Sequence, residues 1–380
     1  MTATITKPEI DFAALAAPGV RGLDPYQPGK PIEEVQREYG FTEVIKLASN
    51  ENPLGPSPNA QAAVRALADK LALYPDGAGF ELKNALAAHC GVPASGITLG
   101  DGSDNLMQLL AQAFLGPGRN AVMSQYAFAA YPIVVRAVGA ELRVAPAQEP
   151  DGTMPYGHDL DAMLALIDAD TRLVFVANPN NPTGTWTRRD ELLQFLDAVP
   201  EGTLAVLDEA YFEYVDEADY PNGARLLERY PNLVVLRTFS KAYGLAGLRV
   251  GYALSHPAVA DLMNRVRMPF NVNALAQAAA LAALGDQDHV RKAVALNREQ
   301  RAELERTFAA MNLTFIPSVG NFITIEVGDA AAVFDALLRR GIIVRPIANY
   351  GMPKHLRVTV GLPEENRRLV EALKQVSKPS

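Results

Sequence analysis

Short apolar runs alternate with amphipathic stretches through residue 236 of the chain. Runs of strand length fall at residues 97–99, 121–124, 141–144, 172–177, 203–207 and 233–236. Apolar residues at helical spacing occupy residues 58–73, 80–90, 105–114, 129–138, 159–167, 188–199 and 224–229. This alternation predicts an α/β fold with a mainly parallel sheet flanked by helices, whose ligands bind at the carboxyl ends of the strands.

The pattern changes after residue 268. An alanine-rich helical stretch at 274–311 precedes predicted strands at 322–327, 342–345 and 356–360 and predicted helices at 330–340 and 364–376. We therefore expect three parts. They are an N-terminal arm with the first elements at 1–48, which packs with the small domain, a large domain at 49–268, and a smaller α+β C-terminal domain at 269–380.

Composition narrows the class of protein. The 380 residues are 49% hydrophobic and 21% charged, as in ordinary soluble globular proteins. A net charge of -8 argues against nucleic acid as a partner, because nucleic-acid binders carry a basic face. The single cysteine, Cys90, excludes an internal disulfide and is typical of a reducing compartment. Without a signal peptide or an apolar run that could cross a membrane, we expect a cytoplasmic protein with no membrane contact.

Polar side chains follow three of the predicted strands. Residues 178–184 come after the strand ending at 177, Asp208 after the strand ending at 207, and Lys241 shortly after the strand ending at 236. Taken singly, residues 178–184 read as a rigid turn and Asp208 as a helix cap or metal ligand. Because parallel strands end at the same edge of a sheet, we expect these residues and Lys241 to lie together in one site. A lysine among hydroxyls and glycines, with Arg249 eight positions later, suits an amine nucleophile beside an anionic cofactor.

A glycine-rich turn at residues 100–104 lies between a predicted strand and a predicted helix. Such a turn presents free N–H groups at a helix start and suits a phosphate. The turn lacks the Gly-x-Gly-x-x-Gly and Gly-x-x-x-x-Gly-Lys patterns, which argues against a dinucleotide-binding module. The five histidines are scattered, without His-Glu-x-x-His, so we expect neither a metallohydrolase nor a metal site. The two predicted domains and the arm take up all 380 residues, which leaves no room for a DNA-binding domain and argues against a regulator.

Several motifs, in their order along the chain, resemble those of pyridoxal-phosphate aminotransferases of fold type I, and within them the histidinol-phosphate aminotransferases. The match covers nearly the whole chain and includes Tyr26-Gln-Pro-Gly-Lys-Pro-Ile-Glu-Glu-Val, Asn50-Glu-Asn-Pro-Leu-Gly, Tyr74-Pro-Asp-Gly, residues 178–184, Asp208-Glu-Ala-Tyr, Ser240-Lys-Ala-Tyr-Gly-Leu-Ala-Gly-Leu-Arg and Leu356-Arg-Val-Thr-Val-Gly. The resemblance implies a seven-stranded type of sheet in a large domain that binds pyridoxal 5'-phosphate.

The resemblance also implies three catalytic residues. Lys241 would form a Schiff base with the cofactor and later carry the Cα proton. Asp208 would keep the cofactor's ring nitrogen protonated, which makes the ring an electron sink. Asn181 and Tyr211 would donate to its phenolic oxygen, and Tyr211 is counted with the catalytic residues.

Further cofactor contacts are implied in the same way. The phosphate would be held by Gly102, Ser103, Asp104, Thr238, Ser240 and Arg249. Tyr126 would stack on the ring, although as an aromatic after a strand it could also be a core residue. Tyr74 would reach the phosphate of the partner subunit, which implies a homodimer with shared active sites. Asn105 stands where the family often has an acidic residue, a minor departure because the backbone supplies most of the contact.

The substrate contacts implied by the resemblance are Arg357 for a carboxylate, Arg345 and Tyr26 for a phosphate, and Asn181 beside them. An ordinary ion pair is the alternative for Arg345. The implied reaction moves an amino group between L-glutamate and imidazole-acetol phosphate, forming 2-oxoglutarate and L-histidinol phosphate, a step of histidine biosynthesis. The alternatives are an aromatic amino-acid aminotransferase and, less favoured, a threonine-phosphate decarboxylase.

Overall fold

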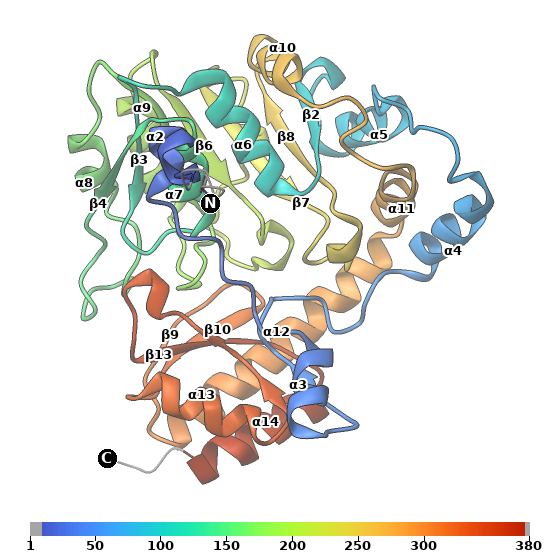
Figure 1. The fold of residues 1–380 in the computed structure, drawn as a ribbon, viewed down its shortest axis with the longest axis vertical. Helices are drawn as coiled ribbons and strands as arrows, with labels where there is room; N and C mark the ends of the chain where they lie inside the picture. The colour runs from blue at the N-terminus through green and yellow to red at the C-terminus, as the bar shows by residue number, and fades with distance from the viewer. Residues whose placement is uncertain (1–9, 377–380) are drawn as a thin grey trace, which may run out of the picture.

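The computed structural model describes residues 10–376. Its larger part is built on a seven-stranded sheet of order β2-β8-β7-β6-β5-β3-β4 (Figure 1). The strands are β2 (Ile97–Gly100), β3 (Asn120–Ser124), β4 (Glu141–Ala145), β5 (Thr171–Ala177), β6 (Leu204–Asp208), β7 (Leu233–Thr238) and β8 (Gly251–Ser255). Strand β8 runs antiparallel to both neighbours, and the other pairs in this sheet are parallel. The predicted α/β fold is therefore confirmed, although the sequence pattern predicts no strand at β8.

Helices cover both faces of this sheet (Figure 1). Side chains alternate along β5, so Val174 and Val176 belong to one apolar cluster, and Leu173 and Phe175 belong to another. The first cluster includes side chains of α4 (Pro58–Leu67), α5 (Phe80–Cys90), α8 (Leu160–Ala165), α9 (Arg189–Ala198) and α11 (Ala274–Gly285). The second includes side chains of α6 (Ser103–Phe114), α7 (Ala130–Ala137) and α10 (Pro257–Val266).

Two helix predictions are corrected. The stretch 224–229 forms only the short 3-10 turn Gly223–Arg225. The predicted helix 274–311 is two helices, α11 and α12 (Gln287–Ala310), with Asp286 between them; its side chain accepts a hydrogen bond from the backbone of His289 at the start of α12. Helix α11 packs on α4 and α5 of the larger part. The first helix after the change of pattern near residue 269 therefore does not pack with the C-terminal part.

The C-terminal part contains a four-stranded antiparallel sheet of order β12-β13-β10-β9. Its elements are β9 (Phe315–Ile316), β10 (Phe322–Glu326), α13 (Ala330–Leu338), β12 (Arg345–Pro346), β13 (His355–Thr359) and α14 (Pro363–Val376). The single strand predicted at 342–345 is wrong, because β11 (Ile342–Ile343) pairs instead with β1 (Ile45–Lys46). Helix α12 joins the two parts (Figure 1).

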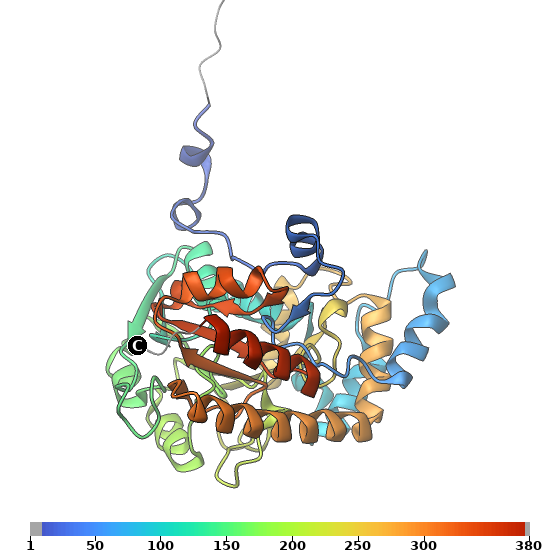
Figure 2. The same cartoon turned by 90° about the horizontal axis from the view of Figure 1, so that it is seen from below.

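The N-terminal segment touches both parts. Val35 of α3 (Ile32–Tyr39) packs with Leu338 and Ile343 in one apolar cluster. The short helices α1 (Phe12–Leu15) and α2 (Pro18–Arg21) precede it, and α2 packs on α7. Figure 2 shows this segment extending outward at one side of the molecule. No helix within residues 10–376 has the length and apolar character needed to cross a membrane.

Candidate active site

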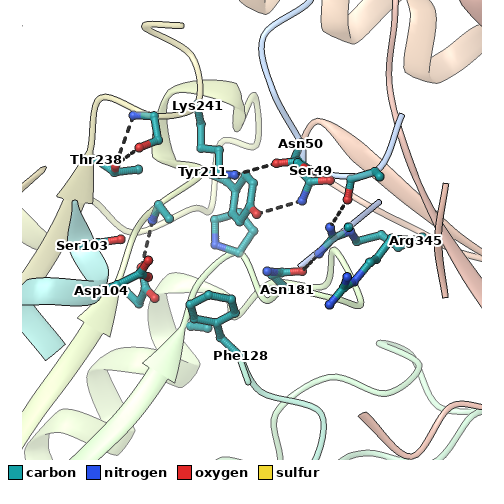
Figure 3. Close-up of a pocket in the computed structure, with 18 of the residues that line it drawn as sticks. Ser49, Asn50, Ser103, Asp104, Phe128, Asn181, Tyr211, Thr238, Lys241 and Arg345 are labelled. Atoms are coloured by element: carbon teal, nitrogen blue, oxygen red, sulfur yellow. Dashed lines mark hydrogen bonds between the residues drawn. The ribbon is translucent and has the colours of Figure 1, made fainter. Parts of the chain in front are cut away.

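The carboxyl ends of β5, β6 and β7 lie side by side, because Ala177 is the sheet partner of Asp208 and Asp208 is the partner of Leu236. The loops that follow these strands carry Asn181, Tyr211 and Lys241 into one cavity (Figure 3). The cavity encloses about 850 Å³ of empty space, including its open mouth. Both parts of the molecule line it, the C-terminal part through Arg345 and Arg357.

Lys241 is the amine of this cavity. Its Nζ donates a hydrogen bond of 2.9 Å to the backbone oxygen of Ser49 and lies 5.7 Å from the ring centre of Tyr211. Burial, and then the positive charge of Arg357, lowers the pKa of Lys241 to about 8. A sizeable fraction of this amine is therefore neutral near physiological pH, as a nucleophile or general base requires.

Asp208 is the buried acid, with only 5% of its surface exposed. Its Oδ2 accepts a hydrogen bond of 2.7 Å from the hydroxyl of Tyr131, and its Oδ1 accepts one of 3.2 Å from the backbone of Ala210. Burial raises the pKa of Asp208 to about 6, which still leaves the carboxylate ionised at neutral pH. Such a group can hold a proton on a basic ring nitrogen.

Tyr211 and Asn181 line the cavity between this acid and the arginines. The Tyr211 hydroxyl accepts a hydrogen bond of 2.9 Å from Asn50 Nδ2, and burial raises its pKa, so the phenol keeps its proton. Asn181 Oδ1 accepts a hydrogen bond from Arg357 Nη1, which leaves the amide nitrogen as the donor available to a ligand.

An anion-binding corner is formed where α6 begins. Gly102 precedes the helix with a φ of 80°, and a Cβ added there would come within 2.3 Å of Arg249 Nη2. The guanidinium of Arg249 lies 3.4 Å from both Asp104 Oδ2 and Ser240 Oγ. The hydroxyl of Thr238 donates to Ser240 Oγ over 3.0 Å. Helix-start N–H groups, hydroxyls and a guanidinium together suit a phosphate.

Two buried arginines occupy the opposite side of the cavity. Arg357 Nη2 donates to the backbone oxygen of Ala48 over 2.6 Å, and its Nε is buried with no partner among the described residues. Arg345 Nη2 donates to the backbone oxygen of Gln27, and its guanidinium lies 5.8 Å from the ring centre of Tyr26. Tyr26 and Asn181 also line the cavity, so the four side chains expected to bind substrate are brought together.

One aromatic residue, Tyr126, is not where the sequence analysis expects it. Tyr126 does not line the cavity; its ring packs edge-on against Tyr156 at 5.4 Å. Phe128, two residues later, lines it instead (Figure 3). Tyr74 is 82% exposed and stacks on Phe270 at 4.6 Å, outside the cavity of its own chain.

Comparisons with known proteins agree with this arrangement. A family model described as aminotransferase class I and II matches residues 42–373. The chain belongs to this aminotransferase family. It is 57% identical to "Histidinol-phosphate aminotransferase 2" of Pseudomonas fluorescens strain Pf0-1, over 96% of this chain and 98% of the relative. It is 58% identical to a protein of the same name from Pseudomonas aeruginosa, again over 96% and 98%.

A solved histidinol-phosphate aminotransferase of Sinorhizobium meliloti, in complex with pyridoxal-5'-phosphate, superposes with a TM-score of 0.85 at 32% identity, over 94% of this chain and 96% of that one. The residues of our aminotransferase fit such a cofactor. A partly neutral lysine, a buried carboxylate and a phosphate corner lie around one cavity. Gly102 leaves room where any side chain would meet Arg249.

Several residues of the aminotransferase site lie outside the set predicted from sequence: Ser49, Asn50, Phe128 and Tyr131. Ser49 contributes a backbone oxygen, which leaves no trace in the residue type. Asn50 has a φ of 56°, in the left-handed region where asparagine is common. Its place in a motif shared with the family is the one signal that could have revealed it. Phe128 and Tyr131 are spaced three apart, a helical spacing that reads as core packing.

Proposed function

We propose that this protein transfers an amino group between L-glutamate and imidazole-acetol phosphate, forming 2-oxoglutarate and L-histidinol phosphate, with pyridoxal 5'-phosphate as its cofactor. The observation that carries the proposal is the partly neutral amine of Lys241 in one cavity with Asp208, Arg345 and Arg357. The names of relatives at 57–58% identity over nearly the full length support the choice of substrate.

The proposed roles divide the cavity into a cofactor side and a substrate side. On the cofactor side, Asp208 would hold the proton on the ring nitrogen, Asn181 and Tyr211 would donate to the phenolic oxygen, and Phe128 would form a wall against the ring. The phosphate would be held in the corner formed by Gly102, Ser103, Asp104, Thr238, Ser240 and Arg249. When bound, the cofactor supplies an electron sink that acidifies the Cα–H bond of an attached amino acid.

Lys241 then moves the proton. Burial and Arg357 lower the pKa of its Nζ. This nitrogen would accept the proton from the substrate Cα and deliver it to the C4′ carbon of the cofactor. The backbone oxygen of Ser49 accepts a hydrogen bond from the same nitrogen and holds the free amine near the cavity. Because both half-reactions use one site, the first product leaves before the second substrate binds, and parallel initial-rate plots are expected.

On the substrate side, two anion sites have distinct roles. The guanidinium of Arg357 is fixed by Asn181 and by the backbone of Ala48, so its planar fork can bind a carboxylate. Arg345 and Tyr26, nearer the N-terminal segment, bind the substrate phosphate. This arrangement lets one cavity accept a dicarboxylic amino acid in one half-reaction and a phosphate monoester in the other.

A homodimer with shared sites is part of the proposal. Tyr74 lies within an exposed apolar surface that also includes Leu71, Leu73, Met268 and Phe270. A second copy of the chain would cover this surface and receive Tyr74 at the phosphate corner of its own cavity. We also propose a cytoplasmic location, from the single buried cysteine.

The test begins with the purified protein. It should absorb visible light after incubation with pyridoxal phosphate, and borohydride reduction should attach the cofactor to the peptide containing Lys241. A colourless protein, or label on another lysine, would overturn the proposal. L-histidinol phosphate should then be a better amino donor than phenylalanine, and light scattering should give the mass of a dimer.

A further inference from the structure

Tyr131 is a fully buried residue in the first turn of α7 that the proposed function leaves without a role. Its ring stacks on Phe175 of β5, with 4.6 Å between ring centres and 13° between planes. Its hydroxyl donates to Asp208 Oδ2 over 2.7 Å. Tyrosine is costly to bury unless its hydroxyl finds a partner, and here that partner is the proposed cofactor acid.

This hydrogen bond completes the fixing of the Asp208 carboxylate. One oxygen receives the Tyr131 hydroxyl from α7, and the other receives the N–H of Ala210 from the turn after β6. Two donors from two different elements define the plane of the carboxylate. A group that must meet a ring nitrogen at a set angle depends on such support from its neighbours.

The same ring touches the other wall of the cavity. Phe128, three positions before Tyr131, meets it edge-to-face with 6.0 Å between centres and 89° between planes. Phe128 lines the cavity and Tyr131 does not. Tyr131 is therefore in contact both with the acid and with the aromatic wall of the cofactor site.

We propose that Tyr131 is a positioning residue, which holds the Asp208 carboxylate in orientation and in its ionised form through its hydroxyl while its ring fixes Phe128. This inference rests on the proposed function, because it assigns a purpose to Asp208. Tyr131 would act on the cofactor only through Asp208 and Phe128.

The electrostatic setting gives the direction of the effect. Burial raises the pKa of Asp208, and the carboxylates of Asp104 and Glu209 raise it further, whereas the donors Tyr131 and Ala210 lower it. The other titratable groups nearby are the hydroxyls of Tyr211 and Tyr220, which burial keeps protonated, and Lys241 across the cavity. Because a donor stabilises the charged carboxylate, loss of the Tyr131 hydroxyl should raise the pKa of Asp208.

The test compares two variants of the full-length, cofactor-loaded protein. Tyr131→Phe keeps the ring and both aromatic contacts but removes the donor. Phe175→Leu weakens the stacking under Tyr131 but leaves the donor in place. For each, we would measure the pH profile of kcat, the dissociation constant for pyridoxal phosphate at several pH values, and the thermal midpoint.

For Tyr131→Phe we expect the acid limb of the profile to move up by about one pH unit, since a hydrogen bond to a charged group shifts a pKa by this order. At pH values below this limb, the affinity for pyridoxal phosphate should fall about tenfold. The thermal midpoint should change little. For Phe175→Leu we expect a lower midpoint and an unmoved limb. An unmoved limb and unchanged affinity in Tyr131→Phe, or equal shifts in both variants, would overturn the inference.

The two proposals can fail separately. If the unaltered protein takes up no pyridoxal phosphate, the proposed function fails. If it takes up the cofactor and transfers amino groups, but Tyr131→Phe matches it in pH profile and affinity, the positioning role alone is wrong.

Discussion

Arg357 donates a hydrogen bond to the side-chain oxygen of Asn181, although the two residues are 176 positions apart and belong to the two different parts of the molecule. Asn181 follows β5 of the large sheet, and Arg357 lies in β13 of the small one. The proposed carboxylate-binding guanidinium is thus held by a residue that we also assign to the cofactor side of the cavity. We therefore expect substrate binding and cofactor orientation to be coupled through this pair.

The two arginines should discriminate between donors. Glutamate and phenylalanine carry a carboxylate, whereas histidinol phosphate carries a phosphate and no carboxylate. Arg357→Lys should lower kcat/KM for glutamate and phenylalanine by roughly 10- to 100-fold, because an ammonium cannot reproduce the two-pronged contact. Arg345→Ala should instead affect histidinol phosphate most. Equal losses for all three donors in either variant would contradict the assignment.

The rate of cofactor capture should report the pKa of Lys241. Only the neutral amine attacks an aldehyde, so the rate should rise with pH and level off above about 8, where burial and Arg357 place the pKa of Lys241. Stopped-flow absorbance on cofactor-free protein would measure it. Arg357→Gln removes one cause of the lowered pKa and should move the midpoint upward. A midpoint near the ordinary lysine value of 10.5 in the unaltered protein would refute this reading.

Replacement of the buried acid should stabilise the cofactor-free protein while abolishing its activity. The pKa of Asp208 is raised from 3.8 to about 6, so the unfolded chain loses this proton first as pH rises. Folding stability therefore falls between about pH 4 and pH 6 and stays lower above that window. Asp208→Asn should gain up to about 3 kcal/mol at pH 8 and little at pH 4. Urea unfolding at both pH values checks this; a gain independent of pH would contradict it.

The aromatic wall can be tested with a matched pair. Phe128→Leu should weaken pyridoxal phosphate binding roughly tenfold, because an aromatic contact is worth about 1 kcal/mol beyond its buried area. Tyr126→Leu should lower the thermal midpoint without changing cofactor affinity, since its ring packs away from the cavity. Fluorescence titration of both variants decides the matter. The opposite result would restore Tyr126 as the stacking residue.

The sequence predicts the central strands well, because buried parallel strands are short apolar runs between polar turns. It misses β8, whose Gly251 and Ser255 dilute the apolar signal. It also joins β11 and β12, because the run Ile-Ile-Val-Arg is continuous in hydrophobicity while its pairing changes from β1 to β13. Periodicity reports which residues are buried, not which strand they pair with.

The site residues also divide into those that the sequence can locate and those that it cannot. Asp208 and Lys241 could be located because parallel strands bring their carboxyl ends to one edge. The sequence could not show that the backbone oxygen of Ser49 contacts Lys241, or that Phe128 and not Tyr126 lines the cavity. Both facts depend on the path of the backbone. Tyr131 could not be recognised either, since its contact with Asp208 spans 77 positions.

Residues 48–50 give three successive contacts to the cavity: Ala48 to Arg357, Ser49 to Lys241 and Asn50 to Tyr211. Two backbone oxygens and one side-chain amide of this tripeptide thus set the positions of the proposed substrate anchor, the proposed nucleophile and a phenol together. A one-residue deletion in this tripeptide would displace all three groups at once, so we expect such changes to eliminate turnover outright, whereas side-chain replacements around the rim would only reduce it.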